Sequence, residues 1–233
     1  LEEKARRAGR LTALGELAAG VAHEMRNPLT TIRGYLQILP ACKDDEGFIQ
    51  EFSENLIREI DRLTRLTDDM LNMAKPISPE LPVESMSAVV LDTLHFLADQ
   101  FTARGIRLRV GEDRDGSPVR MDRDRIKQVM INLLVNAMEA IGENGEVEIR
   151  FSRRLEKMDE NQPPRTFVVT EVVDNGPGIP PHWLDRIFDP FFTTKDTGTG
   201  LGLALSHRIV EEHGGFIRVD SAPGEGTRFW VLL

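Results

Sequence analysis

The chain has a single cysteine, Cys42, among its 233 residues. One cysteine excludes an internal disulfide and a metal site built from several thiolates, and it suits a reducing cytoplasm. No apolar stretch approaches the roughly 20 residues that a membrane-spanning helix needs. The net charge of −9 lacks the basic excess that phosphate backbones attract, so no nucleic acid is expected as a partner.

The sequence also lacks a signal peptide and an initiator methionine, because it begins Leu1-Glu2-Glu3. We therefore expect a cytoplasmic fragment of a longer protein. A sensor or a membrane anchor is the expectation for the missing N-terminal region. The hydrophobic content of 40% is enough to form folded cores, so a disordered chain is excluded.

Residues 8–75, within a first domain predicted over 1–75, carry the pattern of two long helices. Apolar or small residues recur at alternating spacings of four and three, which is heptad spacing. The first helix has them at Leu14, Ala18, Val21, Met25, Pro28, Ile32, Tyr35 and Leu39, and the second at Ile49, Phe52, Leu56, Ile60, Leu63, Leu66, Met70 and Met73. A break is predicted at 40–47. One hairpin has a thin core, so two copies are expected to form a dimeric four-helix bundle.

A proline-containing linker over 76–85 precedes a region, 86–233, in which helices and strands alternate. Three helices are predicted over 86–104, 122–141 and 201–213. Strands are predicted over 106–110, 146–151, 166–173, 216–220 and 227–232, with an exposed loop at 152–165. The predicted fold class is α+β: a helical hairpin followed by a two-layer α/β sandwich.

His23 stands out in the first helix. If Val21 and Met25 face the seam, His23 lies at the outermost point of the heptad and faces solvent. Glu24 follows it, Asn27 lies one turn later, and Pro28 removes a helical hydrogen bond. Taken alone, an exposed histidine beside a glutamate is usually incidental.

Four segments of the second region have features of a nucleotide site. Asn132 and Asn136 share a helix face, and amide oxygens suit Mg²⁺. Asp174 ends a strand before Gly176 and Gly178, where the backbone can turn closely around a base. The third segment has aromatic residues before Lys195. The fourth contains Gly198, Gly200, Leu201 and Gly202 at the start of a predicted helix, where free N–H groups can bind phosphate.

Together with the stretch 17–30, these segments resemble the H, N, G1, F and G2 boxes of sensor histidine kinases of the HisKA type, in the family's order. The resemblance covers about residues 10–233. It implies a kinase that uses ATP and Mg²⁺ to phosphorylate His23 and passes the phosphoryl group to an aspartate of a response regulator. It also implies a homodimer formed through the stem, and an inhibitory protein on the stem is a further candidate partner.

The resemblance also implies roles for individual residues. Glu24 assists the phosphorylation of His23. Asn27 either orients water for dephosphorylation of the regulator or makes only a local hydrogen bond. Asn136 holds Mg²⁺, Asp174 binds the adenine, Lys195 and the glycine loop cover the phosphates, and Thr227 lies near the adenine. Residues 180–200 correspond to a mobile lid.

One residue departs from the family pattern. Many histidine kinases have a lysine three residues after the second asparagine, where this chain has Glu139. The stretch 136–140, which contains this glutamate, resembles that of the nitrogen-regulation and sporulation kinases. Of these, we favour a sporulation kinase of bacilli. A weakly catalytic scaffold or phosphatase therefore remains an alternative. An ATP-driven machine is another, although such enzymes usually have a glutamate where Asn132 stands.

Overall fold

A computed structural model describes residues 2–42, 45–74, 81–113, 117–157, 163–195 and 198–233, with side chains from Gly20 onward except at 73 and 74. The chain divides into two compact units. The first consists of residues 1–75 with 189–201, and the second of residues 76–188 with 202–233.

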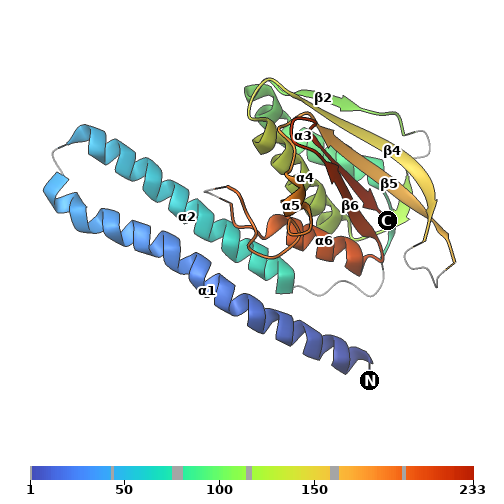
Figure 1. Cartoon of the computed structure of the whole chain (residues 1–233), viewed down its shortest axis with the longest axis horizontal. Coiled ribbons are helices and arrows are strands. Elements are labelled where there is room, and N and C mark those ends of the chain that lie inside the picture. The colour runs from blue at the N-terminus through green and yellow to red at the C-terminus, as the bar shows by residue number, and fades with distance from the viewer. Residues whose placement is uncertain (1, 43–44, 75–80, 114–116, 158–162, 196–197) are drawn as a thin grey trace. The chain divides into compact units, whose positions relative to one another are not determined.

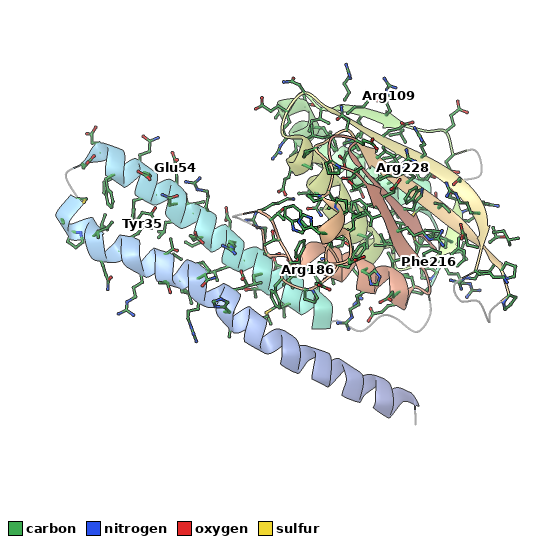
Figure 2. The ribbon with its side chains drawn as sticks, in the orientation of Figure 1. Tyr35, Glu54, Arg109, Arg186, Phe216 and Arg228 are labelled. Carbon is green, nitrogen blue, oxygen red and sulfur yellow. The ribbon has the colours of Figure 1, made fainter. Side chains whose placement is uncertain are left out.

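The first unit contains the predicted helical hairpin. Helices α1 (Glu2–Cys42) and α2 (Glu46–Ala74) run antiparallel and side by side (Figure 1). Val21 and Pro28 of α1 and Leu66 of α2 are buried. Tyr35 lies between the two helices (Figure 2), where its hydroxyl accepts a hydrogen bond of 2.8 Å from Asn55 Nδ2. The apolar stripe thus pairs the two helices, as the heptad spacing predicts.

The hairpin differs from the prediction at two points. Helix α1 continues beyond Pro40 to Cys42, so the break is shorter than 40–47. Asp45 ends the turn, because its Oδ1 accepts a hydrogen bond of 3.1 Å from the N–H of Phe48 in the first turn of α2. Met25 and Ile60, both predicted at the seam, are 37% and 48% exposed on the hairpin surface. The predicted seam residues Leu14, Ala18 and Met73 lie outside the described side chains.

Pro28 lies inside α1 without ending the helix. Its missing N–H takes away the helical donor for the carbonyl of Glu24, four residues earlier. In the following turns Thr30 Oγ1 donates to the Arg26 carbonyl at 2.8 Å, and Thr31 Oγ1 donates to the Asn27 carbonyl at 3.3 Å. Such side-chain bonds to the helix backbone often bend helices. Pro28 therefore weakens the turn after His23, as Pro40 weakens α1 near its end.

The second unit is built on a mixed five-stranded sheet in the order β2-β4-β5-β7-β6. Only β2 and β4 pair in parallel, and the other neighbours are antiparallel. The strands span Arg107–Val110 (β2), Glu146–Glu156 (β4), Arg165–Asp174 (β5), Phe216–Ser221 (β6) and Thr227–Leu232 (β7). Val147 and Ile149 of β4 are fully buried, in the alternating pattern of a sheet with one covered face.

Three helices form the second layer (Figure 1): α3 (Met86–Ala103), α4 (Arg123–Ile141) and α6 (Gly202–Glu212). Helix α4 contacts β4, β5 and both other helices, so it is the centre of the core. Its buried side chains are Ile126, Val129, Met130, Leu133, Leu134, Ala137 and Met138. The side chain of Asp122 caps α4 by accepting hydrogen bonds from the N–H groups of Asp124 and Arg125. The predicted hairpin followed by an α/β domain is confirmed.

Three short elements were not predicted. Strand β1 (Val83–Ser85), at the end of the expected linker, pairs with β3 (Pro118–Arg120), and α5 (Pro181–Leu184) is a single turn. Strands of three residues carry too little periodicity to be recognised in a sequence. Strand β4 extends to Glu156 and strand β5 begins at Arg165, so the loop between them is shorter than the predicted 152–165. Residues 76–80 of the linker lie outside the described residues.

His213, the residue that follows α6, joins two helices of the second unit. Its Nε2 accepts a hydrogen bond of 3.0 Å from the N–H of Asp122, the residue before α4. Its Nδ1 lies 2.6 Å from the Ile209 carbonyl of α6 and must therefore carry the proton. Burial lowers the pKa of His213. The neutral ring is thus the form that the fold accommodates.

We predict that acid destabilises the second unit partly through His213. A lowered pKa means that the unfolded chain binds the proton first, so stability is lost as the pH falls below about 6.5. Replacing His213 with glutamine should reduce the pH dependence of urea unfolding between pH 7 and pH 5. Fluorescence of Trp183 and Trp230, both in this unit, measures the transition. The exposed His95→Gln is the control, and an unchanged pH dependence in His213→Gln would refute the assignment.

Candidate functional site

The segment around His23 lies on one exposed face of α1. His23 and Asn27 are exposed, whereas Glu24 is half-buried. Glu24 Oε2 accepts a hydrogen bond of 2.8 Å from Nη2 of Arg62, which comes from α2. Consecutive helix residues point about 100° apart, so the imidazole faces outward while the carboxylate faces α2. A partner that approaches from solvent can therefore reach His23 directly.

Asn132 of α4 contacts the start of α6 in the second unit. Its Nδ2 donates to the Gly202 carbonyl at 3.0 Å and to Ser206 Oγ at 3.2 Å. Ser206 Oγ also donates to the Gly202 carbonyl at 2.9 Å. Asn132 therefore fixes the beginning of the helix that follows the glycine-rich segment. Asn136 lies one turn further along α4 and is half-buried.

Asp174 is a buried carboxylate at the end of β5, and it is 6% exposed. Its Oδ1 accepts a hydrogen bond of 2.8 Å from the N–H of Gly176. Burial raises the pKa of Asp174, and backbone hydrogen bonds from Gly176 and Thr227 oppose that rise. A carboxylate that is buried in this way at a strand end can accept a hydrogen bond from a ligand amino group.

The residues around Asp174 come from several elements of the second unit. Thr227 of β7 pairs with Asp174 in the sheet and is buried. Its hydroxyl lies 3.1 Å from Ser221 Oγ, which accepts from the N–H of Ile179 at 2.8 Å. Gly178 has a φ of +74°, and a Cβ there would collide with the Ala222 carbonyl. The structure thus brings together four predicted residues, Asp174, Gly176, Gly178 and Thr227.

The segment with Lys195, Gly198 and Gly200 falls in the first unit. It closes on itself, since the Phe191 N–H donates to the Gly200 carbonyl at 2.9 Å and the Gly198 N–H donates to the Lys195 carbonyl at 3.3 Å. A Cβ at Gly200 would collide with the backbone of Phe191, so glycine is required. Leu201, the last residue of the segment, is buried.

Three residues were missed by sequence reasoning: Arg62, Ser206 and Ser221. Arg62 is one of many charged residues on a helix surface and lies 38 residues from Glu24. Ser206 and Ser221 have no motif of their own. The pairing of the two helical stripes could have placed Arg62 near Glu24, because a buried residue lies three or four positions from each of them, Val21 on α1 and Leu66 on α2.

Among the described residues, no three histidine, cysteine, aspartate or glutamate side chains form a metal cluster. Within the same ranges no helix is long and apolar enough to cross a membrane.

Comparison with known protein families identifies the fold. Residues 13–79 match the His Kinase A (phospho-acceptor) domain. Residues 121–233 match the histidine kinase-, DNA gyrase B- and HSP90-like ATPase. The chain belongs to the histidine kinase family, as the order of its motifs predicts.

Relatives and a solved structure agree with this assignment. The chain is 41% identical over 230 residues to the histidine-protein kinase AtoS of Escherichia coli K12, covering 97% of this chain and 36% of AtoS. It is 36% identical over 232 residues to sporulation kinase A of Bacillus subtilis, covering 99% of this chain and 36% of that kinase. The expected likeness to sporulation kinases is confirmed, although the identity to AtoS is higher.

The crystal structure of the histidine kinase ThkA in complex with the response regulator TrrA matches with a TM-score of 0.80 and 32% identity, over 100% of this chain and 65% of that one. The chain spans about a third of the length of AtoS and about half that of another relative, the sensor kinase ZraS of E. coli.

Proposed function

We propose that the chain is the catalytic core of a sensor histidine kinase, which phosphorylates its own His23 from MgATP. The observation that carries the proposal is the exposed His23 beside Glu24, on a helical hairpin of the phospho-acceptor type. The same chain carries the ATPase fold that would supply the donor. The phosphoryl group then passes to an aspartate of a response regulator.

The reaction is an in-line displacement at the γ-phosphorus. One imidazole nitrogen of His23 attacks, the bond between the γ-phosphorus and the bridging oxygen breaks, and ADP leaves with the electron pair. The proton on the other ring nitrogen passes to Glu24, which avoids a cationic phospho-imidazole. Positioned proton transfer of this kind contributes roughly 10²- to 10⁴-fold to the rate. Asn27 is the candidate for orienting water in regulator dephosphorylation.

The nucleotide contacts are assigned to the second unit and the glycine-rich segment. Asp174 accepts from the adenine amino group, Thr227 lies beside it, and Gly176 and Gly178 allow close approach of the base. Lys195, Gly198, Gly200, Leu201 and Gly202 cover the phosphates. Asn132 contributes by fixing the start of α6, which its 3.0 Å bond to the Gly202 carbonyl supports.

Mg²⁺ fits the donor set. It prefers oxygen ligands, keeps several waters, and needs only one or two protein groups beside the phosphates. The half-buried Asn136 amide supplies one such oxygen. The ion would neutralise developing charge on the phosphoryl group.

Homodimerisation through the stem is proposed from the apolar surface of the hairpin. Large apolar side chains stay exposed on both helices: Met25, Leu29, Leu36, Ile38, Ile57, Ile60 and Leu71. A second hairpin would cover such side chains in a four-helix bundle. We assign residues 1–75 to dimerisation and phosphotransfer, 76–85 to a linker that ends in strand β1, and 86–233 to ATP binding. A response regulator is the proposed partner, and an inhibitory protein on the stem is a further one.

A second candidate is a phosphatase or scaffold with weak kinase activity, which Glu139 favours. Glu139 is exposed on α4, three residues after Asn136, where its charge would repel phosphates. A simple ATP-hydrolysing machine is disfavoured, because the Asn132 amide donates to α6 and is a poor general base.

We predict that Glu139→Lys tightens ATP binding roughly threefold, about the effect of one surface charge. Fluorescent-nucleotide titration measures the affinity. Glu143→Lys, just beyond the end of α4, makes the same charge change and is the control. Equal effects of the two variants would show that net charge alone is responsible, and no effect of Glu139→Lys would place the phosphates elsewhere.

The proposed function is tested by incubating the protein with γ-labelled MgATP. Label that is stable in alkali and lost in acid is the expected result, since phosphohistidine has this behaviour. Bound nucleotide without any label would reject the kinase and favour the scaffold.

A further inference from the structure

The ion pair between Glu24 and Arg62 is a feature of the phospho-acceptor segment that the motifs do not include. Arg62 Nη2 donates to Glu24 Oε2 at 2.8 Å, and the two side chains are only 19% and 22% exposed. Partly buried pairs are screened by salt less than surface pairs, so this contact can hold a side chain in place. The residue next to the acceptor histidine is therefore tethered to the opposite helix.

The pair restricts where the Glu24 carboxylate can be. A free glutamate on a helix samples several rotamers, whereas the ion pair with Arg62 holds Glu24 in one of them. Pro28 also weakens the helical bonding of this turn, since it takes the donor from the Glu24 carbonyl. The ion pair ties this turn to α2 by a side-chain contact instead.

We propose that Arg62 is a positioning residue for autophosphorylation: it anchors Glu24 through Oε2 and leaves Oε1 as the acceptor for the imidazole proton when the exposed ring of His23 turns toward α2. The inference rests on the proposed role of Glu24. Proton transfer needs the acceptor within hydrogen-bond reach of the donor, so loss of the anchor lowers the rate of the chemical step. Nucleotide affinity is expected to stay unchanged, because Arg62 is not among the residues proposed to contact the nucleotide.

The test is a double-mutant cycle on single-turnover autophosphorylation, with Arg62→Ala, Glu24→Gln and the double variant. Arg62→Ala should lower the rate constant roughly tenfold with an unchanged ATP concentration for half-maximal rate. Glu24→Gln should lower it by 10²-fold or more, within the usual range for a proton acceptor. The double variant should equal Glu24→Gln, because the anchor has nothing left to position.

Two further variants separate positioning from stability. Arg62→Lys keeps one charged donor and should recover most of the activity lost in Arg62→Ala. Arg58→Ala is the matched control, since Arg58 lies one turn away on α2 and pairs with Asn55. Helicity and dimerisation of each variant are checked by circular dichroism and light scattering.

The outcomes distinguish this inference from the proposed function. Wild-type rates in Arg62→Ala, additive losses in the double variant, or no recovery in Arg62→Lys would each overturn the role of Arg62, provided that Glu24→Gln is impaired. An unimpaired Glu24→Gln would overturn both the anchor and the proposed role of Glu24.

Discussion

Replacing His23 with glutamine is expected to reduce labelling from γ-labelled MgATP to background. Glutamine is of similar size and polarity, but its amide nitrogen has no available lone pair to attack phosphorus. His23 lies on the exposed side of α1, so the substitution leaves no cavity in the hairpin core. The variant should therefore remain folded and dimeric, and it should still bind ATP.

The matched control is His95→Gln, which removes another exposed histidine, on α3. It should be labelled like the wild type. Label retained in His23→Gln would assign the acceptor to another residue. Loss of both label and nucleotide binding would mean that the substitution disturbs the fold.

Replacing Asp174 with asparagine is expected to weaken ATP binding about 10- to 100-fold, the usual effect of losing a charged hydrogen-bond partner. It should abolish phosphorylation of His23 at low ATP. Isothermal titration calorimetry with a non-hydrolysable ATP analogue measures the affinity. The exposed Asp220→Asn, on β6, is the control with the same change of charge.

The same substitution should not cost stability. Burial raises the pKa of Asp174, so the folded protein binds a proton more readily than the unfolded chain. Asp174 therefore lowers the free energy of unfolding once the pH rises above about 3.9, the ordinary pKa of an aspartate, because its ionised form is less favourable in the folded protein. Asp174→Asn should be at least as resistant to urea as the wild type at pH 7, measured by tryptophan fluorescence. Unfolding of the variant would assign Asp174 a structural role instead.

The long elements were predictable because their patterns are long. Heptad spacing over α1 and α2, and apolar runs in β5 and α4, each supply many residues that agree on one structure. The start of α4 was predictable from Asp122, whose short acidic side chain caps the first turn. Motif order identified the family, because several weak motifs in sequence are far more specific than any one of them.

The unpredicted features depend on contacts between distant segments. The Arg62 guanidinium meets Glu24 only because the two stripes of the hairpin pair in one register. His213 meets the N–H of Asp122, 91 residues earlier, through the packing of α6 beside α4. Met25 follows the heptad yet lies on the surface of a single hairpin, since the pattern does not distinguish the hairpin seam from the proposed dimer seam.

The site of phosphorylation tests the central claim most directly. Cleavage after Arg10 and Arg26 releases a peptide, residues 11–26, in which His23 is the only histidine. After incubation with MgATP and digestion at alkaline pH, mass spectrometry should find one added phosphoryl group on this peptide, with fragment ions that place it on His23. A phosphoryl group on Thr12 of the same peptide, or on any other peptide, would contradict the account.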